Sequence, residues 1–339
     1  MKKCLIILLI FNQLQLKSQD AVFSQINESP VILNPANAGS QYDIRTNLNF
    51  RQQWRSVTDP YITIAVSADA KLFSKNSSSS SSLGLGLFVL NDKAGIAKLN
   101  NFKSGLIIAG KVPIASNQNI SSGISLAFSQ THIDLSALSW DKQYDGLNYN
   151  PDLPSGETFI SERTQNIDLG VGVQWSYGKG ATTLSSNDNF AAQAGISVFH
   201  INKPNYDFIT NDKAYIRTMI HTTVSFGVEN SNIQFSPSMY FTFQGPSKML
   251  YLGNFVKYKL QESSKYTDYI LARLLNVGIF YRWRDAIVLI GQVELGQYAL
   301  AISYDINVST LSKVSYGRGG FEISIKYLPI RSSSSSRLI

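Results

Sequence analysis

The chain has 339 residues, a formal net charge of +7 and a single cysteine, Cys4. Because Cys4 lies within the N-terminal apolar run, the processed chain would contain no cysteine, which excludes disulfides, Fe–S clusters, cysteine-ligated zinc and thiol nucleophiles. The basic residues are dispersed along the chain, so the positive charge does not favour nucleic acid as a partner.

The N-terminus has the layout of a secretory signal peptide. Lys2 and Lys3 precede an apolar run over residues 4–11 that is too short to cross a bilayer as a helix, and Ser18 offers a small residue at a cleavage point. We therefore expect residues 1–18 to be a signal peptide. A lipoprotein anchored through Cys4 is disfavoured, because no apolar stretch precedes that cysteine. No later stretch of about eighteen uncharged apolar residues occurs, so the sequence predicts no transmembrane helix.

Residues 19–40 form a polar segment that precedes the first strand pattern. The pairs Asn34–Pro35 and Ala38–Gly39 are typical of turns and not of strands. We expect this N-terminal segment to lie in the periplasm or, if the following strands close into a barrel, to plug its lumen.

Strand patterns follow along the rest of the chain. Residues 167–177 are apolar at every odd position and carry Asp, Gly, Gln or Ser at every even one. Because successive side chains of a strand point to opposite faces, such a segment has one apolar face and one polar or small face. The same criteria predict fourteen strands, near 44–54, 60–70, 83–92, 99–112, 119–132, 165–177, 189–201, 216–228, 231–243, 247–260, 270–282, 285–295, 297–307 and 319–328.

Two folds would accommodate such strands: a soluble β-sandwich, with a protein core on the apolar face, and an outer-membrane barrel, with lipid there. Residues 321–327 place Glu322 and Lys326 on the polar face, where a closed sandwich would bury them and a lumen would hydrate them. Six steps of about 3.3 Å give this strand about 20 Å, with an aromatic residue at each end. The sequence predicts an all-β, antiparallel, transmembrane outer-membrane β-barrel of about 14 strands over residues 41–330, followed by a flexible serine-rich tail, 331–339.

The longest connections would share one side of this barrel. If the first strand rises from the periplasm, residues 133–164, 202–215 and 308–318 lie outside, which is the usual place of long barrel loops. Residues 139–154 are rich in Trp, Tyr, Asp, Asn and Pro, a composition that suits contact with a protein or a glycan, or a loop packed on itself.

No pattern indicates catalysis. The sequence has no G-x-S-x-G elbow, P-loop, H-E-x-x-H or dinucleotide fingerprint. His132, His200 and His221 lie near the ends or starts of different strands and show no metal-ligand spacing. We therefore expect no enzyme, no cofactor and no metal site.

Short motifs in a fixed order resemble the PorP/SprF family of type IX secretion system membrane proteins. The family opening, Q-D-P-x-F-S-Q followed by Y-N-P-A-x-A-G, is similar to Gln19–Gln25 and Leu33–Ser40 here, with Ala21 in place of the usual proline. Further similar motifs are R-x-Q-W at Arg51, H-x-N-x-P-N at His200 and S-Y-D at Ser303. The positions that we consider possible partner or plug contacts are Phe23, Ser24, Gln25, Asn34, Pro35, Gly39, Arg51, Trp54, His200, Asn202, Pro204, Tyr304 and Asp305.

The resemblance implies an outer-membrane barrel of Bacteroidetes-type bacteria with an accessory, non-enzymatic role in type IX secretion or gliding. Such a protein would bind periplasmic ring components of the machinery, or help a secreted surface adhesin to reach and stay on the cell surface. The implied partners are periplasmic and outer-membrane proteins of the secretion system, the adhesin and the lipid bilayer. The alternative function is that of a small-solute porin.

Overall fold

A computed structural model describes residues 20–72, 81–157, 161–181, 187–207, 211–261 and 272–329. The expected signal peptide, 1–18, and the expected serine-rich tail, 331–339, lie outside these ranges, as does most of the serine run 77–82.

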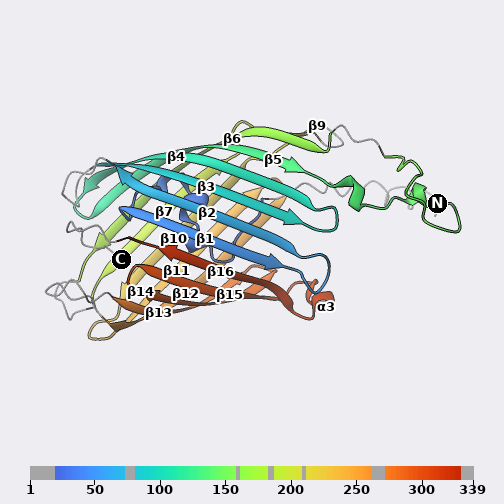
Figure 1. Ribbon diagram of the computed structural model, residues 1–339. Coiled ribbons are helices and arrows are strands. Elements are labelled where there is room, and N and C mark those ends of the chain that lie inside the picture. Colours follow the sequence, from blue (N-terminus) through green and yellow to red (C-terminus); the bar gives the residue numbers. More distant parts are fainter. Residues whose placement is uncertain are drawn as a thin grey trace, which may run out of the picture.

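The described chain forms a closed barrel of fourteen antiparallel strands (Figure 1). The barrel closes where the first strand, β1, pairs with the last strand, β16. The prediction of an all-β, antiparallel barrel of about fourteen strands is therefore confirmed. The strands are β1 (Ile44–Gln53), β2 (Tyr61–Leu72), β3 (Ser82–Ala94), β4 (Leu99–Ala115), β5 (Gln118–His132), β6 (Arg163–Lys179), β7 (Phe190–Phe199), β10 (Arg217–Gly227), β11 (Ile233–Gln244), β12 (Ser247–Gln261), β13 (Arg273–Arg282), β14 (Ala286–Leu295), β15 (Tyr298–Asn307) and β16 (Arg318–Tyr327).

Two further strands lie outside the barrel wall. β8 (Asn205–Asp207) and β9 (Asn211–Lys213) pair with each other in the connection between β7 and β10. The sequence pattern does not indicate them, because three residues are too few to show a period-two alternation.

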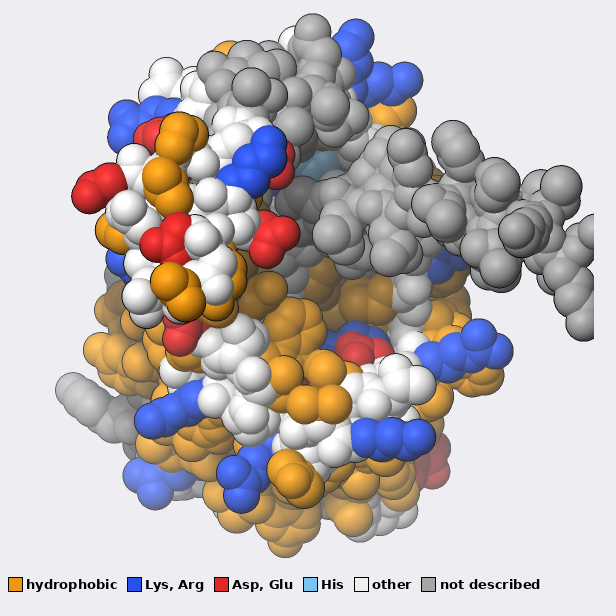
Figure 2. Space-filling model, turned by 90° about the vertical axis from the view of Figure 1, so that its right-hand side faces the viewer, with side chains coloured by type: hydrophobic (Ala, Val, Ile, Leu, Met, Phe, Trp, Pro, Cys, Tyr) orange, Lys and Arg blue, Asp and Glu red, His pale blue; other side chains and the backbone are white. Residues whose placement is uncertain are grey.

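The two faces of the wall differ as the alternation predicts. Strand β15 alternates exposed and buried residues through its whole length, and the exposed ones include Leu300 and Ile302. Leu126, at the middle of β5, keeps 51% of its surface exposed on the outside of the barrel. Apolar side chains cover much of the outer rim in Figure 2. Such an outer face suits lipid, while the inner face carries mainly Ser, Asn, Gln, Gly and charged residues. No helix of the described residues is long and apolar enough to cross a membrane.

The connections alternate between two ends of the barrel. We call the loop end the one formed by residues 54–60, 95–98, 133–157, 161–162, 200–207, 211–216, 245–246, 283–285 and 308–317, and the turn end the opposite one. The connection after β5 contains the short helices η3 (Leu135–Ala137) and η4 (Asp141–Gln143) and extends beyond the wall in Figure 1. The helix α3 (Ser312–Ser315) precedes β16 at the same end.

Aromatic side chains mark both ends on the outer surface. At the turn end Tyr298 stacks on Tyr327, with their ring centroids 5.0 Å apart. At the loop end Tyr281 meets Trp283 edge to face, with their centroids 5.9 Å apart. Aromatic belts at both headgroup levels are typical of outer-membrane barrels.

Candidate functional site: the occupied lumen

The residues before β1 lie inside the barrel. We call residues 20–40 the N-terminal segment; it contains the short helices η1 (Ile26–Glu28), α2 (Pro30–Leu33) and η2 (Pro35–Asn37). Prolines fit the first position of α2 and η2, because that position has no helical partner for an N–H group. The side chain of Asn34 caps η2 by accepting a hydrogen bond from the backbone N–H of Ala36 at 2.9 Å.

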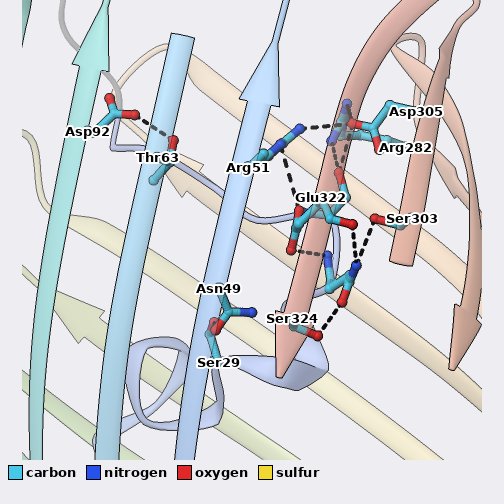
Figure 3. A network of polar contacts seen from close by, with 12 residues as sticks. Ser29, Asn49, Arg51, Thr63, Asp92, Arg282, Ser303, Asp305, Glu322 and Ser324 are labelled. Atoms are coloured by element: carbon cyan, nitrogen blue, oxygen red, sulfur yellow. Dashed lines mark hydrogen bonds and ion pairs between the residues drawn. The ribbon is translucent and has the colours of Figure 1, made fainter. Parts of the chain in front are cut away.

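A cluster of buried charges near the loop end holds Ser24 and Gln25 of this segment (Figure 3). Two arginines from the wall contact one carboxylate: Arg51 and Arg282 each donate a hydrogen bond of 2.9 Å to Asp305. A second carboxylate, Glu322, lies 3.8 Å from the Nε atom of Arg51. Two positive and two negative groups thus share a site that is almost closed to solvent. Such charges need mutual pairing and further hydrogen bonds, because water does not solvate them.

The N-terminal segment supplies these further bonds. The backbone N–H groups of Ser24 and Gln25 donate to the two oxygens of Glu322, at 2.7 and 3.1 Å. The hydroxyl of Ser24 donates to Asp305 at 2.7 Å, and the Gln25 amide donates to Ser303 at 3.1 Å. Without Ser24 and Gln25, Glu322 would keep only its longer contact with Arg51. The cluster is therefore built for an occupied lumen.

A second cluster anchors the segment at the loop end. The carboxylate of Asp20 contacts Lys103 at 3.1 Å, the Nε2 atom of His200 at 2.8 Å and Arg217 at 2.9 Å. Asp168 lies 3.0 Å from the other ring nitrogen of His200. Burial by itself raises the pKa of Asp20, but Lys103, Arg217 and His200 together hold it well below its ordinary range. Burial lowers the pKa of His200, and the carboxylates of Asp20 and Asp168 outweigh that effect and raise it. Both pKa shifts favour the charged form of the side chain, the carboxylate of Asp20 and the imidazolium of His200.

Two more charged pairs fix the rest of the segment. Glu28 pairs with Lys326 at 2.8 Å and accepts a hydrogen bond from Gln292 at 3.0 Å. Towards the turn end, Arg45 and Asp69 form a buried ion pair at 2.8 Å. Asp69 also accepts from the backbone N–H of Gly39 at 2.8 Å, and Arg45 donates to the carbonyl of Asn37 at 3.2 Å. The contacts of the segment thus run from the loop end at Asp20 to the turn end at Gly39.

Small residues of the wall let the segment approach closely. A Cβ atom added at Gly84 would lie 2.0 Å from the carbonyl oxygen of Ala38, and one added at Gly172 would lie 1.9 Å from the amide oxygen of Asn34. Only glycine leaves room for these contacts. Apolar residues fill other gaps, since Phe23 packs with Ala65 and Leu90 of β2 and β3.

A small cavity lies between the segment and the wall near the loop end. It has a volume of about 40 Å³ and lies beside Lys103 and Arg217. A single water needs about 10–15 Å³ by this measure, so the cavity holds a few waters and no larger solute. No group of acidic, histidine or cysteine residues in the described part of the chain is arranged to hold a metal ion.

The structure brings most of the candidate positions together and separates four. Phe23, Ser24, Gln25, Asn34, Pro35 and Gly39 belong to the buried segment. Asp305 and His200 contact it from the wall and the wall end, and Arg51 pairs with Asp305. The other four lie elsewhere: Trp54 meets Tyr61 edge to face at the loop end, Asn202 donates to the Ile167 carbonyl, Pro204 accepts from Ala214 and Tyr304 faces outward.

Several residues of the site were not among the candidates. They are Asp20, Glu28, Arg45, Asp69, Lys103, Asp168, Arg217, Arg282, Glu322 and Lys326. The signal that could have found the eight that lie in strands is a charged residue on the polar face of a strand, whereas Asp20 and Glu28 lie in the N-terminal segment. We expected water to solvate such charges; the structure instead pairs them with one another and with the N-terminal segment.

The fold and the site together define a class of protein: an outer-membrane β-barrel whose lumen is occupied by its own N-terminal segment. The family model of "Type IX secretion system membrane protein PorP/SprF" matches residues 15–327, so the chain belongs to the PorP/SprF family. This family and this fold are those of a secretion-system membrane barrel and not of an enzyme class. The resemblance found in the short motifs is thereby confirmed, and the protein is placed in the outer membrane.

One solved structure, with a TM-score above 0.5, shares the fold. The toluene transporter TbuX of Ralstonia pickettii has a TM-score of 0.52 and 10% identity, with 91% of this chain and 95% of that chain covered. A deletion mutant of the monoaromatic hydrocarbon channel TodX has a TM-score of 0.49 and 11% identity, with 90% and 94% covered. At 10% identity the likeness to TbuX extends to the fold alone. No curated protein matches the sequence.

Proposed function

We propose that this protein is an accessory component of the type IX secretion and gliding machinery that works by binding other proteins at the two ends of its barrel. It binds periplasmic ring components of the machinery and helps a secreted surface adhesin to reach the cell surface and stay there. Family membership supports the link to the machinery. The observation that carries the binding role is the lumen, where residues 20–40 neutralise buried charges along its length.

An occupied lumen favours docking over conduction for two reasons. The buried carboxylates find their hydrogen-bond donors on the segment, so removing the segment leaves charged groups unpaired, which costs several kcal/mol. The closed, edge-free wall then serves as a rigid anchor for its connections. With the long connections outside, the loop end would face the secreted adhesin and the turn end would face the periplasmic ring.

The test is affinity purification of the detergent-solubilised protein from its own cells, followed by mass spectrometry. The proposal expects enrichment of secretion-system ring proteins and of a secreted adhesin over a mock purification. Enrichment of neither would refute it.

Conductance measurements distinguish the proposed binding role from the alternative role of a small-solute porin. Purified protein in planar bilayers is expected to stay closed, and deletion of residues 20–39 is expected to open it. Stable open channels of the intact protein would favour a small-solute porin instead.

A further inference from the structure

The connection after β5 contains a compact loop, residues 140–153, that is organised around one buried side chain. The Oε1 atom of Gln143 accepts hydrogen bonds from the backbone N–H of Trp140 and from the hydroxyl of Tyr149, both at 3.1 Å. The Nε2 atom of Gln143 donates to the carbonyls of Pro151 at 3.3 Å and Leu153 at 3.0 Å. Gln143 is buried although the loop extends beyond the barrel. A single amide therefore ties both arms of the loop together.

The tip of the loop is fixed as well. The Oδ1 atom of Asp145 accepts from the backbone N–H groups of Leu147 at 2.8 Å and Asn148 at 2.7 Å. Asp145 donates its own N–H to the carbonyl of Asn148 at 3.1 Å, and Gly146 takes a positive φ of 100° that suits glycine. The same backbone donors, Asn148 first, lower the pKa of Asp145, so its charge is retained. The apex is thus set before any partner arrives.

This rigid apex presents an apolar group to solvent. Leu147 is 84% exposed, and Tyr144 and Tyr149 beside it are joined by a β-bridge and also exposed. Single exposed leucines are common on proteins. A leucine that a hydrogen-bonded loop holds at its apex between two tyrosines has the arrangement of a residue that anchors a protein–protein interface. Binding through it would lose little conformational entropy, because the loop is already ordered.

The charge around the apex selects the chemistry of the partner. Asp145 is the only charged residue of the tip, residues 144–149, and the rest of the loop, 140–153, adds two aspartates, at 141 and 152, and one lysine, Lys142. Lys142 lies against Gly156, where a Cβ atom would meet its side chain, and so on the stem of the loop and not at its tip. An acidic apex is repelled by phosphate-bearing lipid and attracted to a basic surface.

We propose that the loop 140–153 is a preformed protein-binding surface that inserts Leu147 into an apolar pocket rimmed by lysine and arginine side chains of a protein partner. This inference rests on the proposed function and names the contact through which the loop end would hold its client.

The test uses the full-length protein in nanodiscs and, as the probe, the purified secreted protein that the affinity purification enriches most. Leu147→Asp is expected to weaken binding by about thirty-fold or more, as loss of a central anchor does. Gln143→Ala is expected to weaken binding and to speed hydrogen exchange of residues 144–149. Tyr316→Ser is the matched control, because Tyr316 is 88% exposed on another connection of the same end, and it should leave binding unchanged.

The outcomes separate the two proposals. If purification enriches no protein, the proposed function falls and this inference falls with it. If a protein binds and Leu147→Asp binds it as tightly as the unaltered chain does, only this inference is overturned. Leu147-dependent binding to vesicles that contain lipopolysaccharide, with none to the protein, would overturn it as well.

Discussion

Substitution of Gly84 by alanine tests whether the N-terminal segment can remain docked when the wall no longer admits it. The added Cβ atom would lie 2.0 Å from the Ala38 oxygen and 2.6 Å from its carbonyl carbon, whereas real Cβ atoms keep at least 3.0 Å from other heavy atoms. The obstruction is backbone, so no side-chain rotation relieves it, and the segment must retreat by about 1 Å.

That retreat would break two bonds to charged groups, the one from the Gly39 N–H to Asp69 and the one from Arg45 to the Asn37 carbonyl. Each is worth about 1.5–3 kcal/mol, so the turn-end anchorage should weaken by about 3–6 kcal/mol, a factor on the order of 10² to 10⁴. We expect faster hydrogen exchange at residues 37–40 and openings in planar-bilayer recordings.

Gly291→Ala is the control for this prediction. Gly291 also lies within a strand, but an added Cβ atom meets nothing within 4 Å there. If the Gly84→Ala variant is as well protected from hydrogen exchange as the Gly291→Ala variant and stays closed as that variant does, the segment does not depend on the space at Gly84.

Three further predictions concern the charges and the lipid face. Arg51→Ala should destabilise the folded barrel by about 3–5 kcal/mol in chemical unfolding, because it strands buried carboxylates, whereas Lys98→Ala at an exposed pair should stay within about 1 kcal/mol. Because the pKa of His200 is raised, its charged form stabilises the docked segment below its unfolded pKa of about 6.5, and this contribution is lost as pH rises through the higher folded value. Hydrogen exchange at residues 20–25, corrected for intrinsic rates, should therefore be faster at about pH 8.5 than at about pH 6; His200→Gln should abolish the difference, and equal rates in the unaltered protein would contradict it. Leu126→Arg should cost about 2–4 kcal/mol when folding is measured in lipid bilayers, and no cost would mean that this face does not touch lipid.

The wall of the barrel could be predicted from the sequence because each of its residues has only two environments. In β15 the choice between lipid and lumen is repeated at every position, so the alternation alone locates the strand. The sheet of β8 and β9 escaped prediction, since it is too short to have a period.

The contacts inside the lumen could not be derived in the same way. Ser24 and Glu322 are 298 residues apart, and no local pattern links a backbone N–H to a distant carboxylate. Motif proximity also misleads about direction: Tyr304 and Asp305 are neighbours in one motif, yet the first faces outward and the second contacts Ser24. The family motifs thus indicate which stretches contribute to the site, and only the fold shows whether each residue faces the lumen or the outside.

The position of the charged cluster that binds Ser24 has a consequence for the assembly of the barrel. Arg51 and Glu322 lie directly opposite each other across the seam where the first and last strands meet. The binding site of Ser24 and Gln25 is therefore complete only when the last strand has paired with the first. Docking of the N-terminal segment at this cluster and closure of the barrel are therefore coupled.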